Sequence, residues 1–184
     1  MEIFALVTGV IFLLLEIKQH NLMWLLQAIS GAASVVVFFR QGLYASMGLN
    51  VYYVIMAVWG YIQWRRDSAS VDSGAVHLRR ITLPVVLVSI AAQIAGTILF
   101  LYLLRILGDS MSGLDAGVTV LSVIATWWLV RSYKEQWLLW IIADVLMVVM
   151  CLCQSLWWMS ALYFFYIVSA VYGFVYWKRQ GEYL

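Results

Sequence analysis

The hydrophobic residues of this chain gather in seven long stretches, each separated from the next by charged or polar residues. Because a helix needs about 20 mostly apolar residues to cross a bilayer, this pattern predicts seven transmembrane helices. The predicted spans are Ile3–Ile17, Leu22–Phe39, Leu43–Trp64, Thr82–Leu104, Asp115–Val130, Trp137–Cys153 and Leu156–Trp177. One polar segment, residues 67–81, is long enough to be a loop that divides the chain.

The composition supports a membrane protein. Of the 184 residues, 65% are hydrophobic and 11% are charged, whereas soluble domains have about 25% charged residues. Seven spans and their connections account for the whole length, so we expect no fused soluble domain. The net charge of +2 is too small, and the basic residues are too scattered, for nucleic-acid binding. We therefore predict an all-α membrane protein that lies in the lipid bilayer.

Lys and Arg residues are unevenly shared between the two sides of the membrane. If the N-terminus lies outside, only Arg40 and Arg105 fall on the outer side. The others fall on the inner side: Lys18, Arg65, Arg66, Arg79, Arg80, Arg131, Lys134, Lys178 and Arg179. Because basic residues concentrate in cytoplasmic loops, we predict an outer N-terminus and a cytoplasmic C-terminus.

The second half of the chain repeats the first half at an offset of 113 residues. The matched pairs include Trp24 with Trp137, Tyr53 with Tyr166, Gly60 with Gly173 and Trp64 with Trp177. Shared hydrophobic bias does not readily match Trp and Gly residues, so we infer a duplication. The predicted domains are a first three-helix bundle (1–66), a cytoplasmic loop (67–81), a linker helix (82–104) and a second three-helix bundle (115–179).

A single linker helix restores the orientation of the second copy to that of the first. The repeats are therefore predicted to be parallel, related by an axis along the membrane normal. This 3+1+3 plan is the one used by SWEET-type sugar transporters, and it places a substrate site between the bundles near the midplane.

Asp144 is the first candidate for such a site. It lies about 10 Å into the sixth span at 1.5 Å per residue. An ionised carboxylate at that depth costs several kcal/mol unless it is paired or hydrated. We predict that Asp144 is the counter-charge for a cationic substrate. The alternative is a carboxyl group that is protonated or hydrogen-bonded between helices.

Trp137 and Trp140 share a helix face with Asp144, because their spacing follows the helical period. Aromatic faces attract cations, and a desolvated contact is worth about 2 kcal/mol. Two indoles beside one carboxylate suit a flat, positively charged ring. For Trp137, the alternative is an anchor at the membrane interface, where many tryptophans lie.

Four more polar residues within the predicted spans are candidates for hydrogen bonds or stacking with a substrate: Asn50, Tyr53, Gln93 and Tyr166. Each could instead hold helices together, which is a common role for polar groups in membranes. Gln93 lies in a long apolar run and its amide must find partners, so it either binds the ligand or braces the bundle.

For the other charged, histidine and cysteine side chains we expect structural roles. We expect Glu16 to be a surface carboxylate at the membrane interface and Asp115 to complement the N-terminus of the fifth span. We expect the two histidines, His20 and His77, to lie in loops, where they have no neighbours at metal-ligand spacing. We expect the two cysteines, Cys151 and Cys153, to be small buried hydrophobic residues that form no disulfide framework. Because no catalytic or phosphate-binding motif is present, we predict neither an enzyme nor a cofactor.

Three stretches resemble the PnuC family of bacterial vitamin transporters. They are Leu43–Ser46 leading through Tyr52-Tyr53 to Gly60 and Trp64, Leu121–Thr126, and Trp137-Leu138-Leu139-Trp140. The last stretch is similar to the WxxW motif of the family's sixth helix, whose tryptophans line the site for the vitamin's aromatic ring. The resemblance covers nearly the whole chain. It implies a transporter of the bacterial inner membrane that forms a homo-oligomer, namely a homotrimer.

The resemblance also bears on the substrate. In nicotinamide riboside carriers of the family, Asn is usual where this chain has Asp144, and Asn is also common where it has Ala57. An Asp at the first of these positions, with the Tyr52-Tyr53 pair, looks more like the thiamine-transporting branch, sometimes called PnuT.

We therefore predict a facilitator for thiamine, a small cationic aromatic vitamin, that works by alternating access of the two bundles. Trp137, Trp140 and Asp144 would bind the ring and its charge. A carboxylate that must stay charged to hold a cation is a poor proton carrier, so no ion coupling is expected. The resemblance implies that phosphorylation in the cytoplasm traps the vitamin. The alternatives are a nicotinamide riboside or riboflavin transporter and, from another class, a non-transporting membrane scaffold.

Overall fold

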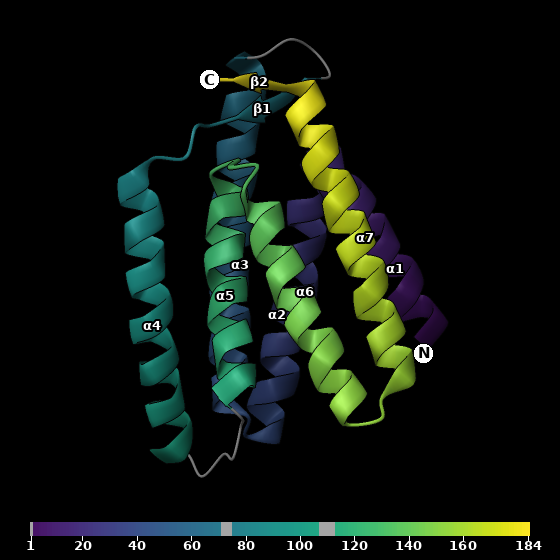
Figure 1. The fold of residues 1–184 in the computed structure, drawn as a ribbon, viewed down its shortest axis with the longest axis vertical. Helices are drawn as coiled ribbons and strands as arrows, with labels where there is room; N and C mark the ends of the chain where they lie inside the picture. Colours follow the sequence, from purple (N-terminus) through teal and green to yellow (C-terminus); the bar gives the residue numbers. More distant parts are fainter. Residues whose placement is uncertain (1, 71–74, 107–112) are drawn as a thin grey trace. The chain divides into compact units, whose positions relative to one another are not determined.

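The computed structural model describes residues 2–70, 75–106 and 113–184, with side chains from residue 9 onward. In this part of the chain, seven α-helices follow one another, with a 3-10 helix and two short strands at their ends (Figure 1). The elements are α1 (Glu2–Ile17), α2 (Leu22–Gln41), α3 (Tyr44–Asp67), η1 (Ser68–Ser70), β1 (Val76–Leu78), α4 (Leu83–Ile106), α5 (Gly113–Val130), α6 (Gln136–Cys153), α7 (Trp157–Gln180) and β2 (Gly181–Tyr183). The seven-helix prediction is confirmed, and each predicted boundary lies within three residues of the observed one.

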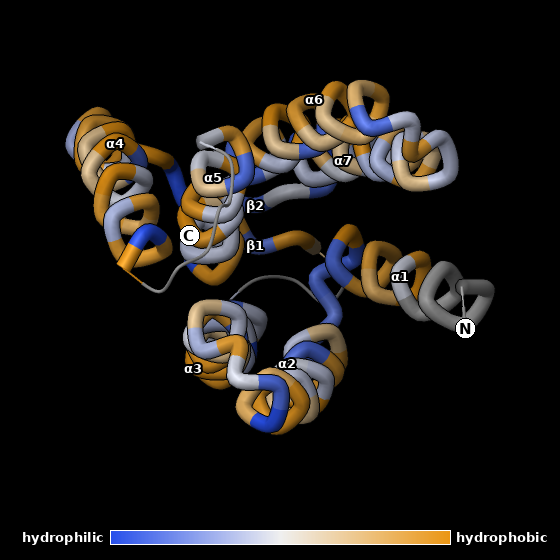
Figure 2. The backbone as a smooth tube through the Cα atoms, turned by 90° about the horizontal axis from the view of Figure 1, so that it is seen from below, coloured by the Kyte–Doolittle hydropathy of each residue, from blue (hydrophilic) through white to orange (hydrophobic). Residues whose placement is uncertain are grey.

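The helices have the surface of a membrane protein. Among the described residues, α2 to α7 are each long and apolar enough to cross a bilayer, whereas α1 is shorter, at 16 residues. Large apolar side chains point outward along these helices; Ile98 of α4, for example, is 65% exposed. Figure 2 colours the helices mainly as hydrophobic, with many of the hydrophilic segments at or near the turns. An exposed apolar surface of this extent is typical of contact with lipid.

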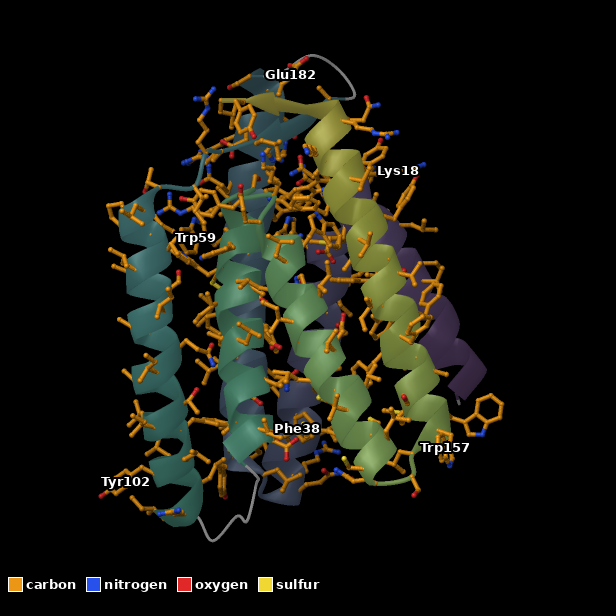
Figure 3. The ribbon with its side chains drawn as sticks, viewed as in Figure 1. Lys18, Phe38, Trp59, Tyr102, Trp157 and Glu182 are labelled. Atoms are coloured by element: carbon orange, nitrogen blue, oxygen red, sulfur yellow. The ribbon has the colours of Figure 1, made fainter. Side chains whose placement is uncertain are left out.

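The ends of the helices follow from the local sequence. Pro84 is the second residue of α4, where a missing backbone N–H breaks no helical hydrogen bond. Gly42 follows α2 with a φ of 72°, and its backbone N–H donates to carbonyl oxygens of the last helical turn. Glycine adopts this left-handed conformation without strain. Tyr102 and Trp157, near the ends of α4 and α7, are exposed and point away from the ribbon (Figure 3). Aromatic residues in such places are typical of membrane interfaces.

The described residues form two compact units. Unit 1 contains the chain up to Leu78, with Val130–Ser132 and Tyr176–Leu184, and unit 2 contains Arg79–Leu129 and Tyr133–Val175. In unit 2, an apolar cluster is built around Ile124, Trp128 and Tyr133, and the indole N–H of Trp128 donates to Ser89 Oγ at 3.0 Å. The repeat-based division into 1–66, 67–81, 82–104 and 115–179 stays a prediction.

A small parallel sheet in unit 1 joins the polar segment to the C-terminal end of the chain. β1 pairs with β2, with His77 opposite Glu182. The side-chain amide of Gln19 forms hydrogen bonds with both the backbone N–H and the carbonyl of His77. Its Nε2 donates to the His77 carbonyl at 3.1 Å, and the His77 N–H donates to Oε1 at 2.9 Å. The prediction that His77 lies in a loop was wrong, because a buried strand forms there; residues 71–74 of the predicted loop lie outside the described residues.

Aromatic rings pack beneath this sheet. The ring of Trp64 meets Trp24, His77 and Trp177 edge to face, at centroid distances of 4.9, 5.7 and 6.3 Å. The indole N–H of Trp177 donates to the carbonyl of Ile17 at 2.9 Å. Trp64 and Trp177 are matched at the offset of 113 residues in the sequence, so two matched residues lie near each other in unit 1.

This packing corrects two further predictions. Glu16 is buried, with 4% exposed, and is therefore not a surface carboxylate; the end of α1 is covered where Trp177 binds it. Cys151 is buried as predicted, but Cys153 is exposed, because a residue two positions further along a helix faces another side. Asp115 lies in the first turn of α5, as predicted.

Candidate functional site

One face of α6 carries three of the predicted site residues. Trp137, Trp140 and Asp144 stand at spacings of three and four residues, which brings them to the same side of the helix. Asp144 is 9% exposed, so its carboxylate faces protein and not lipid. Within the residues that the structure describes, no Lys or Arg forms an ion pair with it. A carboxylate buried in a span without a basic partner indicates a functional site.

Two tyrosines of α7 lie close to this carboxylate. Tyr163 and Tyr166 both lie within electrostatic range of Asp144. The two rings pack edge to face, with centroids 6.0 Å apart. The structure therefore brings together Asp144 and Tyr166, both predicted, and adds Tyr163. The spacing of three residues between the tyrosines, which puts them on one face of a helix, was the signal that could have included Tyr163.

The two tryptophans of the α6 face have different surroundings. Trp137 is 1% exposed, and its six-membered ring lies directly against Gly173 of α7. Trp140 is half-buried, and its indole Nε1 is buried without a hydrogen-bond partner among the described residues. Because buried donors are normally paired, Trp140 offers a position for a ligand acceptor. The substrate-binding role of both tryptophans stays a prediction.

Gln93 holds two helices of unit 2 together. Its Nε2 donates to the carbonyl of Gly117 in α5 at 2.9 Å and to Thr97 Oγ1 in its own helix at 3.2 Å. Its Oε1 is buried and accepts no hydrogen bond from the described residues. One part of the amide therefore braces α4 against α5, while the oxygen is available as an acceptor.

Asn50 and Tyr53 belong to unit 1, whereas the other five predicted residues belong to unit 2. The Asn50 Nδ2 donates to the carbonyl of Ser46, one turn earlier in α3, at 2.9 Å. The ring of Tyr53 packs against Tyr52 with centroids 5.6 Å apart. Both residues thus make contacts within their own helix, and their substrate-binding role stays a prediction.

The chemistry of the α6 and α7 groups suits an organic ligand better than a metal ion. Among the described residues, no three His, Cys, Asp or Glu side chains lie close enough to hold a metal. The groups near Asp144 are aromatic rings with polar edges, whereas metal ions need several oxygen, nitrogen or sulfur ligands. Aromatic faces beside a carboxylate are instead suited to a flat cation.

Among the described residues, seven helices, six of them long and apolar enough to cross a bilayer, and a carboxylate buried within one span define the class: an all-helical, multi-pass membrane transporter.

The comparisons with known proteins identify the family within this class. The family model described as nicotinamide mononucleotide transporter matches residues 1–179. The nicotinamide riboside transporter PnuC of Neisseria mucosa is 28% identical over 191 residues, which cover 95% of this chain and 70% of that protein. The protein of the same name from Escherichia coli is 28% identical over 172 residues, which cover 80% of this chain and 72% of that one. A crystal structure of the vitamin B3 transporter PnuC matches with a TM-score of 0.70 at 26% identity, covering 95% of this chain and 78% of that chain. The chain therefore belongs to the nicotinamide mononucleotide transporter family, and the predicted PnuC resemblance is confirmed.

Proposed function

We propose that this chain is a facilitator for a flat, positively charged vitamin, with nicotinamide riboside as the first candidate. The observation that carries the proposal is the buried Asp144, which lies near two tyrosines and has no basic partner among the described residues. The relatives from Neisseria mucosa and Escherichia coli are named as nicotinamide riboside transporters. Those names support this substrate better than thiamine, which the residue pattern and the family resemblance favoured.

The chemistry of nicotinamide riboside matches the groups of the site. Its quaternary pyridinium ring is flat and positively charged, so Asp144 offsets the charge while the face of Trp140 attracts the ring. Its ribose hydroxyls both donate and accept hydrogen bonds. They complement the indole N–H of Trp140 and the carbonyl oxygen of Gln93, two buried groups without partners among the described residues. A few polar groups in an apolar interior are typical of small-molecule sites.

Thiamine is the second candidate, and the carboxylate of Asp144 favours it. Thiamine has a quaternary thiazolium ring beside an aminopyrimidine. A carboxylate, unlike an amide, both offsets the ring charge and accepts a charge-assisted hydrogen bond. Neutral riboflavin has no positive charge for Asp144 to offset and is therefore the weakest of the three vitamins considered.

The transport mechanism that we propose is alternating access of the two repeats around a fixed site. The excess of Lys and Arg on one side supports an orientation with the N-terminus outside and the C-terminus in the cytoplasm of a bacterial cell. No ion coupling is required, because phosphorylation of the vitamin after entry keeps its free concentration in the cytoplasm low. The working form is a homo-oligomer, for which the family resemblance implies a homotrimer.

Uptake into proteoliposomes tests this function. Vesicles that hold the purified chain are loaded with unlabelled vitamin and diluted into radiolabelled nicotinamide riboside or thiamine. A facilitator gives a transient accumulation of label by exchange, without any ion gradient, and vesicles without protein give none. If folded protein exchanges neither vitamin, the transport proposal is contradicted and the membrane scaffold is favoured.

A further inference from the structure

Trp137 lies in a space that a side chain on α7 would otherwise fill. A Cβ added to Gly173 would lie 2.6 Å from Cζ2 of Trp137 and 2.7 Å from its Cε2 and Cη2. Real Cβ atoms essentially never approach other atoms within 3.0 Å. Because Trp137 is almost fully buried, its six-membered ring is fixed against the bare backbone of α7. Only glycine at position 173 permits this ring position.

The first repeat contains the same contact, 113 residues earlier in the chain. A Cβ added to Gly60 of α3 would lie 2.5 Å from Cε2 and Cζ2 of Trp24 in α2. Trp24 is also fully buried. A tryptophan on a glycine therefore joins α2 to α3 in unit 1, and an equivalent pair joins α6 to α7 in unit 2. The contact belongs to the common scaffold of the repeat.

The two contacts differ in what stands beside them. Three and seven residues after Trp137, the chain has Trp140 and Asp144, which are the candidate groups for a cationic ring. The corresponding positions after Trp24 hold Gln27 and Gly31, and neither carries an aromatic face or a charge. The same packing is therefore purely structural in the first repeat and adjoins the proposed site in the second.

We propose that Gly173 is a positioning residue of the substrate site. Its bare backbone sets how closely the indole of Trp137 lies against α7, and thereby where that ring stands beside Trp140 and Asp144. The inference rests on the proposed function, since it concerns the same site. A methyl group at position 173 would displace the ring by several tenths of an ångström. Trp137 would then turn about its side-chain torsions and present its face differently to a ligand.

A matched pair of variants tests the proposal, because the chain provides its own control. Gly173→Ala and Gly60→Ala introduce nearly the same clash in the two repeats. In purified full-length protein we expect both to lower the melting temperature by similar amounts. Calorimetric titration with nicotinamide riboside and with thiamine should show a Kd raised about tenfold or more in Gly173→Ala, and within about twofold of wild type in Gly60→Ala.

Trp137→Phe completes a double-mutant cycle. Phenylalanine lacks the part of the indole that would meet the new methyl group. We therefore expect Gly173→Ala to change Kd by less than about twofold when it is added to Trp137→Phe, so the two effects are strongly non-additive. The melting temperature of the double variant should be equal to or higher than that of Trp137→Phe. This comparison stands even if Gly173→Ala alone fails to fold.

Three results would overturn the positioning role while wild-type binding is intact. They are an unchanged Kd in Gly173→Ala, an equal rise of Kd in Gly60→Ala, and a further tenfold loss when Gly173→Ala is added to Trp137→Phe. A wild-type chain that binds neither vitamin would overturn the proposed function and, with it, the role of Gly173. The two failures are thus distinguishable.

Discussion

Replacement of Asp144 by Asn removes one negative charge and leaves the size of the side chain nearly unchanged. Asp144 is buried within a span, so solvent ions screen its charge poorly. For a cation about 5 Å away and an effective dielectric constant of about 20, the attraction is about 3 kcal/mol. Dehydration of the two charges offsets part of this attraction. We therefore expect the variant to lose roughly 1.4 to 2.8 kcal/mol of binding free energy, a rise in Kd of about 10- to 100-fold.

Calorimetric titration of the purified protein with two ligands isolates this effect. One ligand is nicotinamide riboside, and the other is its reduced form, which has nearly the same shape but an uncharged ring. Asp144→Asn should weaken the binding of the charged form and leave the Kd of the reduced form within about threefold. Asp115→Asn removes a carboxylate from the first turn of α5 and serves as the control, with no change expected for either ligand. Equal losses for the charged and uncharged ligands would refute the counter-charge argument.

Three further predictions concern the scaffold. Gln19→Ala leaves the two buried backbone groups of His77 without these partners, so thermal unfolding should show a loss of about 2 kcal/mol; an unchanged melting temperature would contradict the role of this side chain. Gln93→Leu removes the hydrogen bond to Gly117 and should destabilise the protein by about 1 kcal/mol. If its free oxygen also binds the vitamin, Kd should rise about tenfold in titration calorimetry, and an unchanged Kd would leave Gln93 as a brace only. Truncation after Gln180 removes β2, the partner of β1, so trypsin should cleave after β1 faster than in the full chain; an equal rate would contradict a stabilising role of the sheet.

The spans could be predicted from the sequence because one physical requirement dominates them. Every backbone group in the bilayer core must be paired within the chain, so each long apolar run becomes a helix. The duplication stays a prediction, which rests on matches at a fixed offset such as that of Trp64 with Trp177. The structure brings these two rings within 6.3 Å of each other, a proximity that the offset alone does not specify.

The small sheet could not be predicted in the same way. Strands of three residues are too short to show a periodic pattern. β1 also pairs with a strand about a hundred residues later in the chain, and no local signal reports such a pairing. The burial of Glu16 was missed for a similar reason, since the end of α1 binds a residue far along the chain: the indole N–H of Trp177 donates to the carbonyl of Ile17.

For the candidate site, the sequence predicts which groups carry the chemistry but not how they pack, and their binding role stays a prediction. The depth of Asp144 and its spacing from Trp140 follow from helical geometry. The contact of Trp137 with Gly173 does not follow from helical geometry. The sequence matches Trp137 with Trp24 and Gly173 with Gly60, but it does not show that a matched tryptophan contacts a matched glycine. To predict this contact, one must know which faces of α6 and α7 pack against each other.

The central claim is that Asp144 and its aromatic neighbours select a flat vitamin by its positive charge. Equilibrium binding of radiolabelled nicotinamide riboside to the wild-type chain, with unlabelled thiamine and riboflavin as competitors, tests this claim most directly. We expect saturable binding that unlabelled nicotinamide riboside displaces, that thiamine displaces at comparable or higher concentration, and that riboflavin leaves unchanged. Displacement by neutral riboflavin as effective as that by the cationic vitamins, or no saturable binding of the labelled vitamin, would contradict it.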